Sequence, residues 1–365
     1  MAITPATINV LVVDDSAFMR KAISMMLESD PQIKVVGMAH DGIEAIEKVT
    51  SLKPDLVTLD IEMPRMDGIT ALSRIMKENP TPVIMVSSIT SDGADATLKA
   101  LDLGAIDFIP KQLSYVSLDV VKIKQTLIDK VKHINSRRRT LMAQYALGIR
   151  RKSLGESGGQ TTYRITPLTK KKLVRREIKI VAIGTSTGGP PALQKVISNL
   201  PKDLPSGVLV VQHMPPTFTK SLANRLDSLS AIKVKEAEHG EPIVAGCVYI
   251  APGDRHLKVR KWGANADIKL DNNPPDMPHK PSVDVLMDSV AETYGDTSLG
   301  VILTGMGSDG TNGLTHMKEK GAKVIAQNEQ TSVVYGMPRS VVEKGIADKV
   351  VSIEQIAPTI ISYFR

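Results

Sequence analysis

The sequence predicts an α/β protein with two domains, each organised around a mainly parallel β-sheet. Short apolar runs rich in β-branched residues alternate with amphipathic helical patterns over residues 8–134, and the alternation resumes at residue 178. The chain has 365 residues, which is long for one domain. Its 42% apolar and 23% charged residues are ordinary for a globular protein and exclude a mostly disordered chain.

The N-terminal domain, residues 8–130, is predicted to hold five strands separated by helices such as AFMRKAISMMLES (17–29) and GIEAIEKVTSL (42–52). Because parallel strands need a crossover connection, these helices predict a doubly wound, five-stranded parallel sheet. The predicted strands are INVLVV (8–13), KVVGMA (34–39), DLVTL (55–59), PVIMVS (82–87) and AIDFI (105–109).

Residues 131–177 are predicted to be a basic interdomain linker, because polar stretches such as GESGGQTTYR replace the alternation. Residues 136–177 contain twelve Lys or Arg and two Glu, so their net charge is +10 and the rest of the chain carries −3. Only 3% of residues are aromatic, too few for base-stacking platforms. A solvated linker is therefore favoured over a nucleic-acid-binding arm. TLMAQYALGIR (140–150) predicts a short helix within it.

The C-terminal domain, residues 178–365, is predicted to be a second α/β unit with a mainly parallel sheet. CVYIA (247–251) and HLKVRK (256–261) predict a hairpin or meander, followed by a polar tract at 271–281. The other predicted strands are 178–184, 207–212, 298–305 and 322–327, and the predicted helices are 190–200, 219–229, 282–295 and 311–321.

Several function classes are excluded or disfavoured by composition. The sequence contains no run of about 18 apolar residues, so no transmembrane helix is expected. The N-terminus lacks the basic head and apolar run of a secretory signal. The one cysteine, Cys247, cannot form an internal disulfide and excludes a cysteine-based zinc site. We expect a cytoplasmic monomer that neither inserts into membranes nor binds nucleic acid.

Polar side chains follow the predicted strands of the N-terminal domain. Asp14 and Asp15 follow the first strand and Asp60 the third, while Ser87 ends the fourth and Lys111 follows the fifth. Ligands of doubly wound sheets bind at these carboxyl ends. Three repelling carboxylates favour a hard cation such as Mg²⁺, beside which a carboxylate can attack a phosphoryl group. The alternative is that single aspartates only cap helices.

The segments VLVVDDS, LDIEMPRMDG, MVSS and GAIDFIPK resemble a two-component response-regulator receiver domain. The resemblance implies that Asp60 is phosphorylated, that Mg²⁺ binds Asp14, Asp15, Asp60 and the backbone carbonyl of Glu62, and that Ser87, Phe108 and Lys111 form the switch. One departure is that receivers usually have proline after the lysine, whereas here Pro110 precedes Lys111 and Gln112 follows.

The start of the C-terminal domain, IKIVAIGTSTGGPPALQKVI, reads as a strand, a tight glycine turn and a helix that contains G-x-S-x-G at Gly184–Gly188. Such a turn places Ser186 at the top of the sheet, near backbone N–H groups that can stabilise an oxyanion. The alternatives are a purely structural turn and a dinucleotide loop, although G-x-G-x-x-G is absent.

A nucleophilic serine needs a base and an orienting carboxylate. His213 follows the next strand, and Asp309 lies in the glycine-rich turn after SLGVILTG, so both are expected at the edge that carries Ser186. The alternative for Asp309 is an N-cap of the following helix. The order Ser–His–Asp differs from the Ser–acid–His order of α/β-hydrolases, so that superfamily is not assigned.

The segments AIGTSTGG, VVQHMPPTFT, YIAPGDRHL, PSVDVL and LTGMGSDG resemble the catalytic domain of chemotaxis protein-glutamate methylesterases. With the receiver and linker, the resemblance covers nearly the whole chain. It implies a triad of Ser186, His213 and Asp309, with Thr187 and the backbone N–H of Met306 at the active-site turn.

The resemblance further implies a phosphorylation-activated hydrolase that demethylates glutamyl methyl esters on chemoreceptors and also deamidates receptor glutamines. A chemotaxis histidine kinase would phosphorylate it, with Mg²⁺ needed only by the receiver and no metal at the hydrolytic site. The alternative is a non-catalytic response regulator that binds DNA or a protein partner, for which the basic linker is the only support.

Overall fold

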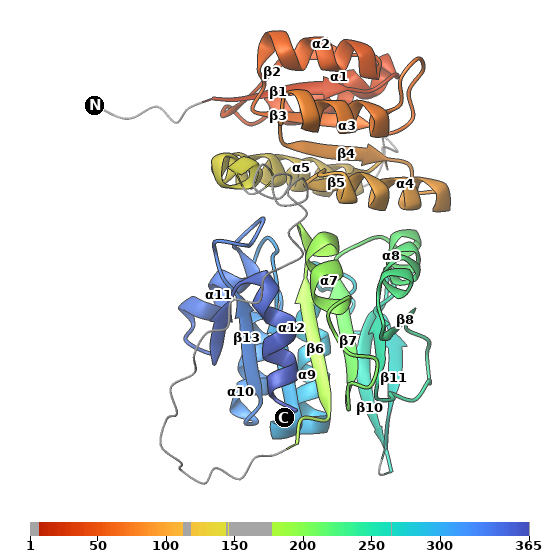
Figure 1. Ribbon diagram of the computed structural model, residues 1–365, viewed down its shortest axis with the longest axis vertical. Helices are drawn as coiled ribbons and strands as arrows, with labels where there is room; N and C mark the ends of the chain where they lie inside the picture. Colours follow the sequence, from red (N-terminus) through yellow and green to blue (C-terminus); the bar gives the residue numbers. More distant parts are fainter. Residues whose placement is uncertain (1–6, 112–117, 144, 146–176, 264, 365) are drawn as a thin grey trace, which may run out of the picture.

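The computed structural model describes residues 7–111, 118–143, 145, 177–263 and 265–364. Two α/β domains lie one above the other in Figure 1, and the edge of the N-terminal domain formed by α4, β5 and α5 faces the C-terminal domain. This arrangement confirms the predicted fold class.

The N-terminal sheet has the strand order β2-β1-β3-β4-β5, and all of its pairings are parallel. Helices α1 and α5 contact each other on one face, while α2, α3 and α4 pack in sequence on the other. The elements are β1 (Ile8–Val13), α1 (Ala17–Glu28), β2 (Ile33–Ala39), α2 (Gly42–Leu52), β3 (Leu56–Asp60), α3 (Gly68–Glu78), β4 (Val83–Ser87), α4 (Ser91–Asp102), β5 (Asp107–Pro110) and α5 (Leu118–Ser136).

Helix α5 runs past residue 130, the limit expected for this domain. The reason is burial: Val131 and Ile134 are fully buried in the N-terminal core. The predicted helix at 140–150 lies mostly outside the described residues, although residues 140–143 are helical.

The C-terminal sheet has seven strands in the order β14-β13-β12-β6-β7-β9-β8, and all of its pairings are parallel. The order places the ends of β12, β6 and β7 side by side. The elements are β6 (Ile180–Thr185), α7 (Gly189–Ile197), β7 (Gly207–Gln212), α8 (Pro216–Leu229), β8 (Lys233–Glu236), β9 (Cys247–Ile250), β10 (His256–Trp262), β11 (Asn265–Asp271), α9 (Val283–Tyr294), β12 (Ser298–Ile302), α10 (Thr311–Glu319), β13 (Lys323–Gln327), α11 (Met337–Glu343), β14 (Lys349–Val351) and α12 (Ile353–Ser362).

The expected hairpin of residues 247–251 and 256–261 is wrong. Strand β9 instead joins the main sheet between β7 and β8, and β10 pairs antiparallel with β11 as a separate two-stranded unit. Strand β11 (NADIKLD) was not predicted, although its residues alternate between polar and apolar.

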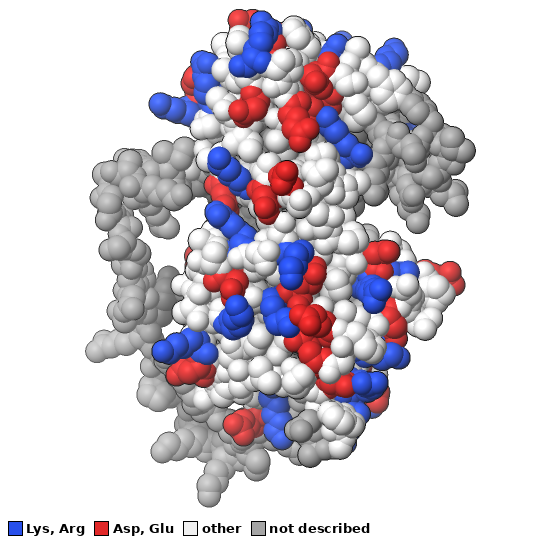
Figure 2. All heavy atoms as spheres, turned by 90° about the vertical axis from the view of Figure 1, so that its right-hand side faces the viewer, with Lys and Arg blue, Asp and Glu red and all other residues white. Residues whose placement is uncertain are grey.

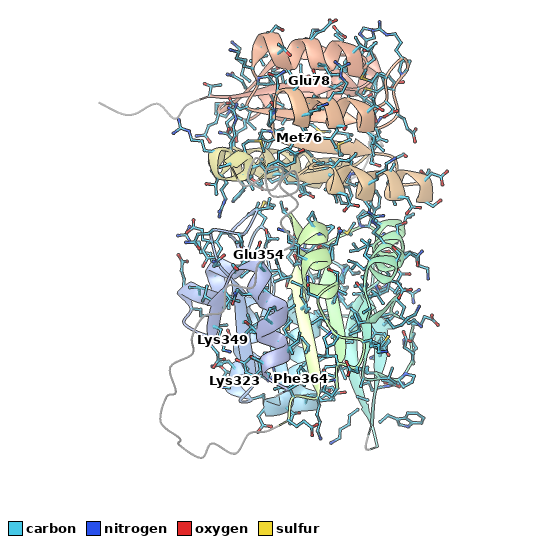
Figure 3. The ribbon with its side chains drawn as sticks, viewed as in Figure 1. Met76, Glu78, Lys323, Lys349, Glu354 and Phe364 are labelled. Atoms are coloured by element: carbon cyan, nitrogen blue, oxygen red, sulfur yellow. The ribbon has the colours of Figure 1, made fainter. Side chains whose placement is uncertain are left out.

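One apolar cluster extends across both domains. Met76 on α3 is buried within it, whereas Glu78 on the same helix faces outward (Figure 3). Across the domain boundary, the Phe108 ring of β5 stacks on the Phe218 ring of α8 with centroids 4.6 Å apart. Arg225 of α8 forms an ion pair with Asp102 of α4. The two domains therefore share a packed interface.

Basic and acidic side chains are interspersed on the face shown in Figure 2. Among the described residues, opposite charges form ion pairs such as Lys235 with Glu241 and Arg260 with Asp267. This mixing agrees with the small net charge of −3 that the chain carries outside residues 136–177.

Candidate functional site

The receiver-like site lies where β1, β3 and β5 end. Lys111 Nζ lies 2.6 Å from Asp60 Oδ2 and 3.1 Å from Asp14 Oδ2. Both carboxylates are buried, whereas Asp15 is exposed at the rim of the site. The sequence predicted this convergence of carboxylates and one ammonium at the carboxyl ends of the strands.

The aspartates of this site are not helix caps. Ser16 caps α1 and Asp67 caps α3 through their side chains. Burial raises the pKa of Asp60 to about 6; the Lys111 hydrogen bond opposes this rise and the charge of Asp14 adds to it. Burial also raises the pKa of Asp14, against the pull of Lys111. One ammonium thus leaves the paired carboxylates incompletely neutralised.

The donor set suits a hard cation. Oxygen atoms from Asp14, Asp15 and Asp60 lie within 4.8 Å of one another. Three carboxylates balanced by one ammonium leave an excess of negative charge, and oxygen ligands of this kind are those that Mg²⁺ prefers. The Glu62 N–H donates to Asp60 Oδ1 at 3.3 Å, which holds the backbone of residue 62 beside the site.

Of the three predicted switch residues, Lys111 contacts Asp60, whereas Ser87 and Phe108 have other partners. The Ser87 hydroxyl donates to Gly93 O at 3.0 Å and to Ser88 O at 3.2 Å, so it faces α4. Phe108 stacks on Phe218 of the other domain. The Lys111 N–H donates to Ser87 O at 2.7 Å, so the backbone at Lys111 continues the β4–β5 pairing despite the preceding Pro110.

The candidate hydrolytic site lies at the adjacent ends of β6, β7 and β12. The Ser186 N–H donates to Thr304 O at 3.0 Å, and the His213 N–H donates to Thr185 O at 3.2 Å. These bonds continue the sheet beyond its strands and bring Ser186 and His213 next to each other. The Gln212 amide supports the turn by donating to Ser186 O at 2.9 Å.

The turn at Ser186 requires glycine. Gly188 has φ +74°, and a Cβ at Gly189 would lie 1.8 Å from Gln212 Oε1. The next two residues, Pro190 and Pro191, have no N–H. The amide of Thr187 has no hydrogen-bond partner among the described residues, so it is available to an oxyanion.

A second free amide belongs to Met306, which also has no partner among the described residues. A Cβ on Gly305 would lie 2.9 Å from Ser186 Cβ, so this turn packs directly against the serine. The amides of Thr187 and Met306 thus flank Ser186 from two different strand ends.

His213 and Asp309 form a pair, with His213 Nε2 2.8 Å from Asp309 Oδ2. The other ring nitrogen, Nδ1, is buried and has no partner among the described residues. Ser186 Oγ has no hydrogen bond to it within the same ranges, which is common before substrate binds. Nδ1 is therefore the nitrogen left to accept the serine proton.

The N-cap alternative for Asp309 does not hold for the helix that follows it, because Gly310 precedes α10. The Asp309 carboxylate instead accepts hydrogen bonds from the start of α9. Burial alone would raise the pKa of Asp309, yet His213 and the amides of Asp284 and Val283 hold it well below its usual range. The carboxylate therefore stays ionised.

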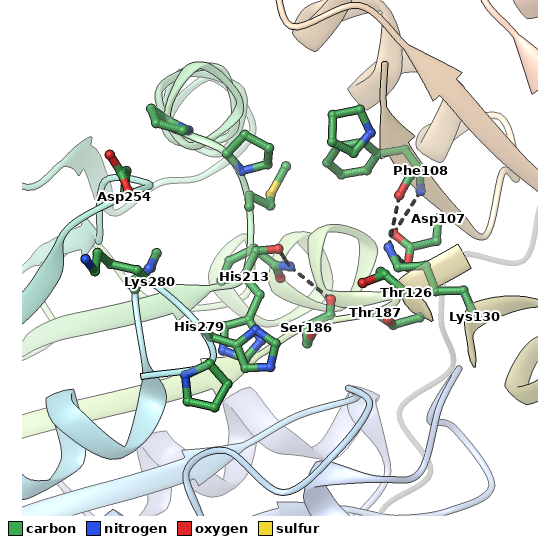
Figure 4. Close-up of a pocket in the computed structure, with 17 residues that line it drawn as sticks. Asp107, Phe108, Thr126, Lys130, Ser186, Thr187, His213, Asp254, His279 and Lys280 are labelled. Carbon is green, nitrogen blue, oxygen red and sulfur yellow. Dashed lines mark hydrogen bonds and ion pairs between the residues drawn. The ribbon is translucent and has the colours of Figure 1, made fainter. Parts of the chain in front are cut away.

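His279 is a site residue that the sequence did not single out. Its ring stacks on His213 with centroids 4.0 Å apart (Figure 4). Burial in the cavity, with the adjacent His213, lowers the pKa of His279 to about 4, so it is neutral near pH 7. Its position just before the recognised PSVDVL segment was the only available signal.

A cavity of about 560 Å³ opens in front of Ser186. Ser186, His213 and His279 line one side, and Asp107, Phe108 and Lys130 of the N-terminal domain line the other (Figure 4). Any molecule that reaches Ser186 through this cavity passes beside the N-terminal domain.

These two sites define a class: a receiver-type domain joined to an α/β domain with serine, histidine and aspartate at one sheet edge. Residues 10–120 match the family described as "Response regulator receiver domain", and residues 181–360 match "CheB methylesterase". The chain therefore belongs to the CheB methylesterase family, and it carries an N-terminal receiver domain.

Relatives of known name are similar over the full length. The chain is 50% identical to "Protein-glutamate methylesterase/protein-glutamine glutaminase 2" of Nitratidesulfovibrio vulgaris, covering 97% of this chain and 99% of that protein. It is 45% identical to "Protein-glutamate methylesterase/protein-glutamine glutaminase" of Pyrococcus horikoshii, covering 97% and 93%. The solved CheB methylesterase catalytic domain of Thermotoga maritima is 50% identical with a TM-score of 0.50, covering 50% of this chain and 97% of that one.

These matches favour the hydrolase over the non-catalytic DNA- or partner-binding regulator. Within the described ranges, no helix has the length and apolar character needed to cross a bilayer.

Proposed function

We propose that this chain is a phosphorylation-controlled carboxylic ester hydrolase. It removes methyl groups from glutamyl methyl esters on chemoreceptors and converts receptor glutamines to glutamates. The observation that carries the proposal is the His213–Asp309 pair, 2.8 Å long, at the strand end next to Ser186. The printed names of the full-length relatives support this substrate class.

The hydrolytic mechanism follows from the groups at this edge. His213 Nδ1 accepts the Ser186 proton while Ser186 Oγ attacks the ester carbonyl carbon. The amides of Thr187 and Met306 stabilise the oxyanion. Methanol leaves with the proton from His213, or ammonia leaves when the substrate is glutamine. Water then hydrolyses the acyl-enzyme, and Asp309 stabilises the transient imidazolium throughout.

The receiver domain regulates the hydrolase through phosphorylation. Asp14, Asp15 and the carbonyl of Glu62 would hold Mg²⁺ beside Asp60, where the cation would neutralise phosphoryl oxygens. The Asp60 carboxylate attacks the phosphorus of a phosphohistidine, which we propose is carried by a histidine kinase. The P–N bond breaks, the kinase imidazole leaves, and Asp60 becomes an aspartyl phosphate. Lys111 then pairs with the phosphoryl oxygens, and Ser87 turns from Gly93 toward them.

The interface carries this signal to the hydrolase. Phe108, on the strand next to Ser87, is stacked on Phe218 and lines the cavity in front of Ser186. Movement of Ser87 and Lys111 changes the β4–β5 surface that holds Phe108. The stack then breaks and opens the cavity to a receptor helix. The limits 8–130, 131–177 and 178–365, the monomeric state and the cytoplasmic location stay predictions.

Methanol release from methyl-esterified receptor preparations tests the proposal. Wild-type protein should release methanol, and Ser186→Ala should reduce the rate at least about 10⁴-fold, because members of a triad act as a unit. Ser198→Ala, at the opposite end of α7, is the matched control and should retain the rate. A folded Ser186→Ala protein with the wild-type rate would exclude the serine mechanism.

A further inference from the structure

The start of helix α9 encloses the Asp309 carboxylate. The Ser282 hydroxyl donates to Oδ1 at 2.9 Å and the Asp284 N–H donates to the same oxygen at 3.0 Å. The Val283 N–H donates to Oδ2 at 2.8 Å, beside the bond from His213. Four donors therefore fix both carboxylate oxygens, and the helix N-terminus adds its favourable dipole.

Ser282 differs from the two backbone donors, Val283 and Asp284, because its donor is a side-chain hydroxyl that a substitution can remove. Ser282 is fully buried, and it is the N-cap of α9, accepting the Val285 N–H at a long 3.4 Å. Its own proton has Asp309 as its acceptor. Capping uses the hydroxyl only as an acceptor, so the short bond to Asp309 is not explained by capping.

The backbone of Ser282 is anchored from behind by another buried residue. Its N–H donates to His256 Nδ1 at 3.2 Å, and His256 Nε2 lies 3.1 Å from Pro274 O. His256 is fully buried, and burial lowers its pKa, so the ring is neutral with its proton on Nε2. This fixed ring sets the position of Ser282.

These contacts form a continuous chain from His256 through Ser282 and Asp309 to His213. We propose that Ser282 is a positioning residue of the hydrolytic site: its hydroxyl sets the orientation of Asp309 and, through it, the ring of His213. The inference rests on the proposed function. It predicts that loss of the hydroxyl lowers kcat and leaves KM unchanged, because Ser282 does not line the cavity.

Two substitutions separate positioning from capping. Ser282→Gly removes the hydroxyl but remains an acceptable N-cap, whereas Ser282→Thr keeps the hydroxyl. With phosphodonor and Mg²⁺ present in full-length protein, Ser282→Gly should lower kcat about 10- to 100-fold. Ser282→Thr should stay within about threefold of wild type.

The matched control is Ser289→Ala on the same helix. The Ser289 hydroxyl accepts the Val259 N–H at 3.0 Å and donates to Leu286 O, away from Asp309. This variant should lower the melting temperature without changing kcat beyond about twofold. If Ser282→Gly matches Ser289→Ala in kcat, or if its loss lies only in KM, the proposal is wrong.

A spectroscopic measurement separates this proposal from the proposed function. The proton between His213 Nε2 and Asp309 should give a low-field NMR resonance, assigned by its loss in His213→Gln. Ser282→Gly should shift or broaden this resonance in substrate-free protein, and Ser289→Ala should not. An unchanged resonance overturns the role of Ser282, whereas absence of wild-type hydrolysis with the shift intact overturns only the proposed function.

Discussion

Asp60 and Asp309 are aspartates at the carboxyl ends of two parallel sheets in one chain, and their surroundings differ. Asp60 is buried, and the side chain of Asp309 is 10% exposed. Burial by itself acts to raise the pKa of each carboxyl group. Asp60 shares the single ammonium of Lys111 with Asp14, and its pKa rises to about 6. Asp309 accepts two backbone amides, one hydroxyl and the His213 ring, and its pKa lies well below the usual range. The number of donors, not burial, decides which carboxylate is stably ionised.

The difference matches the two proposed chemistries. An under-neutralised Asp60 suits a site that gains its remaining positive charge from a bound cation before it accepts a phosphoryl group. A fully hydrogen-bonded Asp309 is ionised from the start, so the hydrolytic pair is assembled without a further ligand.

The largest effect is expected from Asp309→Asn. An asparagine offers His213 an amide in place of a charge and favours the wrong imidazole tautomer, so the hydrolysis rate should fall about 10³- to 10⁴-fold. The loss should be the same with and without phosphodonor, measured as methanol release. Asp288→Asn on the exposed side of α9 is the control. Retention of more than a tenth of the wild-type rate by Asp309→Asn would argue against its role.

The corresponding substitution at Asp60, Asp60→Asn, should affect only the regulation of hydrolysis by phosphorylation. Asp60→Asn cannot form an acyl phosphate, so the stimulation by phosphodonor, about 5- to 150-fold for typical couplings, should vanish while the basal rate stays within about twofold. Asp30→Asn, at the other end of the receiver sheet, should respond like wild type. Stimulation that persists in Asp60→Asn would place the phosphoacceptor elsewhere.

Stability should change in opposite directions in the two variants. A raised pKa in the folded state contributes stability at pH values below the unfolded pKa, and this contribution is lost as pH rises through about 6. Asp60→Asn should therefore stabilise the metal-free receiver at pH 7 by about 1–3 kcal/mol and have little effect at pH 4.

For Asp309, the effect of the pKa shift on stability has the opposite sign. Its lowered pKa contributes stability above the unfolded pKa that is lost only in strong acid. Asp309→Asn should therefore destabilise the catalytic domain at pH 7. Calorimetry without metal, which measures the stability of each variant relative to wild type, tests both predictions. A change in stability in the same direction for both variants would contradict the comparison.

The smallest effect is expected at the rim of the domain interface. Arg225 and Asp102 form a partly exposed ion pair, a type that contributes about 0.2–1 kcal/mol. Arg225→Gln should weaken docking of the receiver and raise the unphosphorylated rate about 1.5- to 3-fold. Lys233→Gln, whose partner Asp227 lies in the same domain, is the control and should leave that rate unchanged.

The sequence predicted the candidate residues that lie at or shortly after the ends of strands. Ser186 and His213 follow apolar runs, as do Asp14, Asp60 and Lys111, and Asp309 lies in the glycine-rich turn after another such run. Parallel topology brings these positions together. The fold class could therefore be predicted without coordinates, and both sets of candidate residues could be proposed, whereas the order of the strands in each sheet was not predicted.

The parts that were missed depend on long-range packing. Strand β11 is held by antiparallel pairing with β10 along its whole length, a partnership that is not visible from its own residues. The stack of Phe108 on Phe218 joins residues 110 positions apart in different domains. Ser282 and His279 reach the site through the loop before α9, and nothing in their local pattern specifies where that loop packs.

We propose that the receiver covers the entrance to Ser186 until Asp60 is phosphorylated. The most direct measurement compares initial rates of methanol release, at matched concentration, for full-length protein and for residues 178–365 alone, each with and without phosphodonor and Mg²⁺. The isolated domain should be faster than unphosphorylated full-length protein and should not respond to the phosphodonor. An isolated domain that is slower than unphosphorylated full-length protein would contradict the claim and show that the receiver assists hydrolysis.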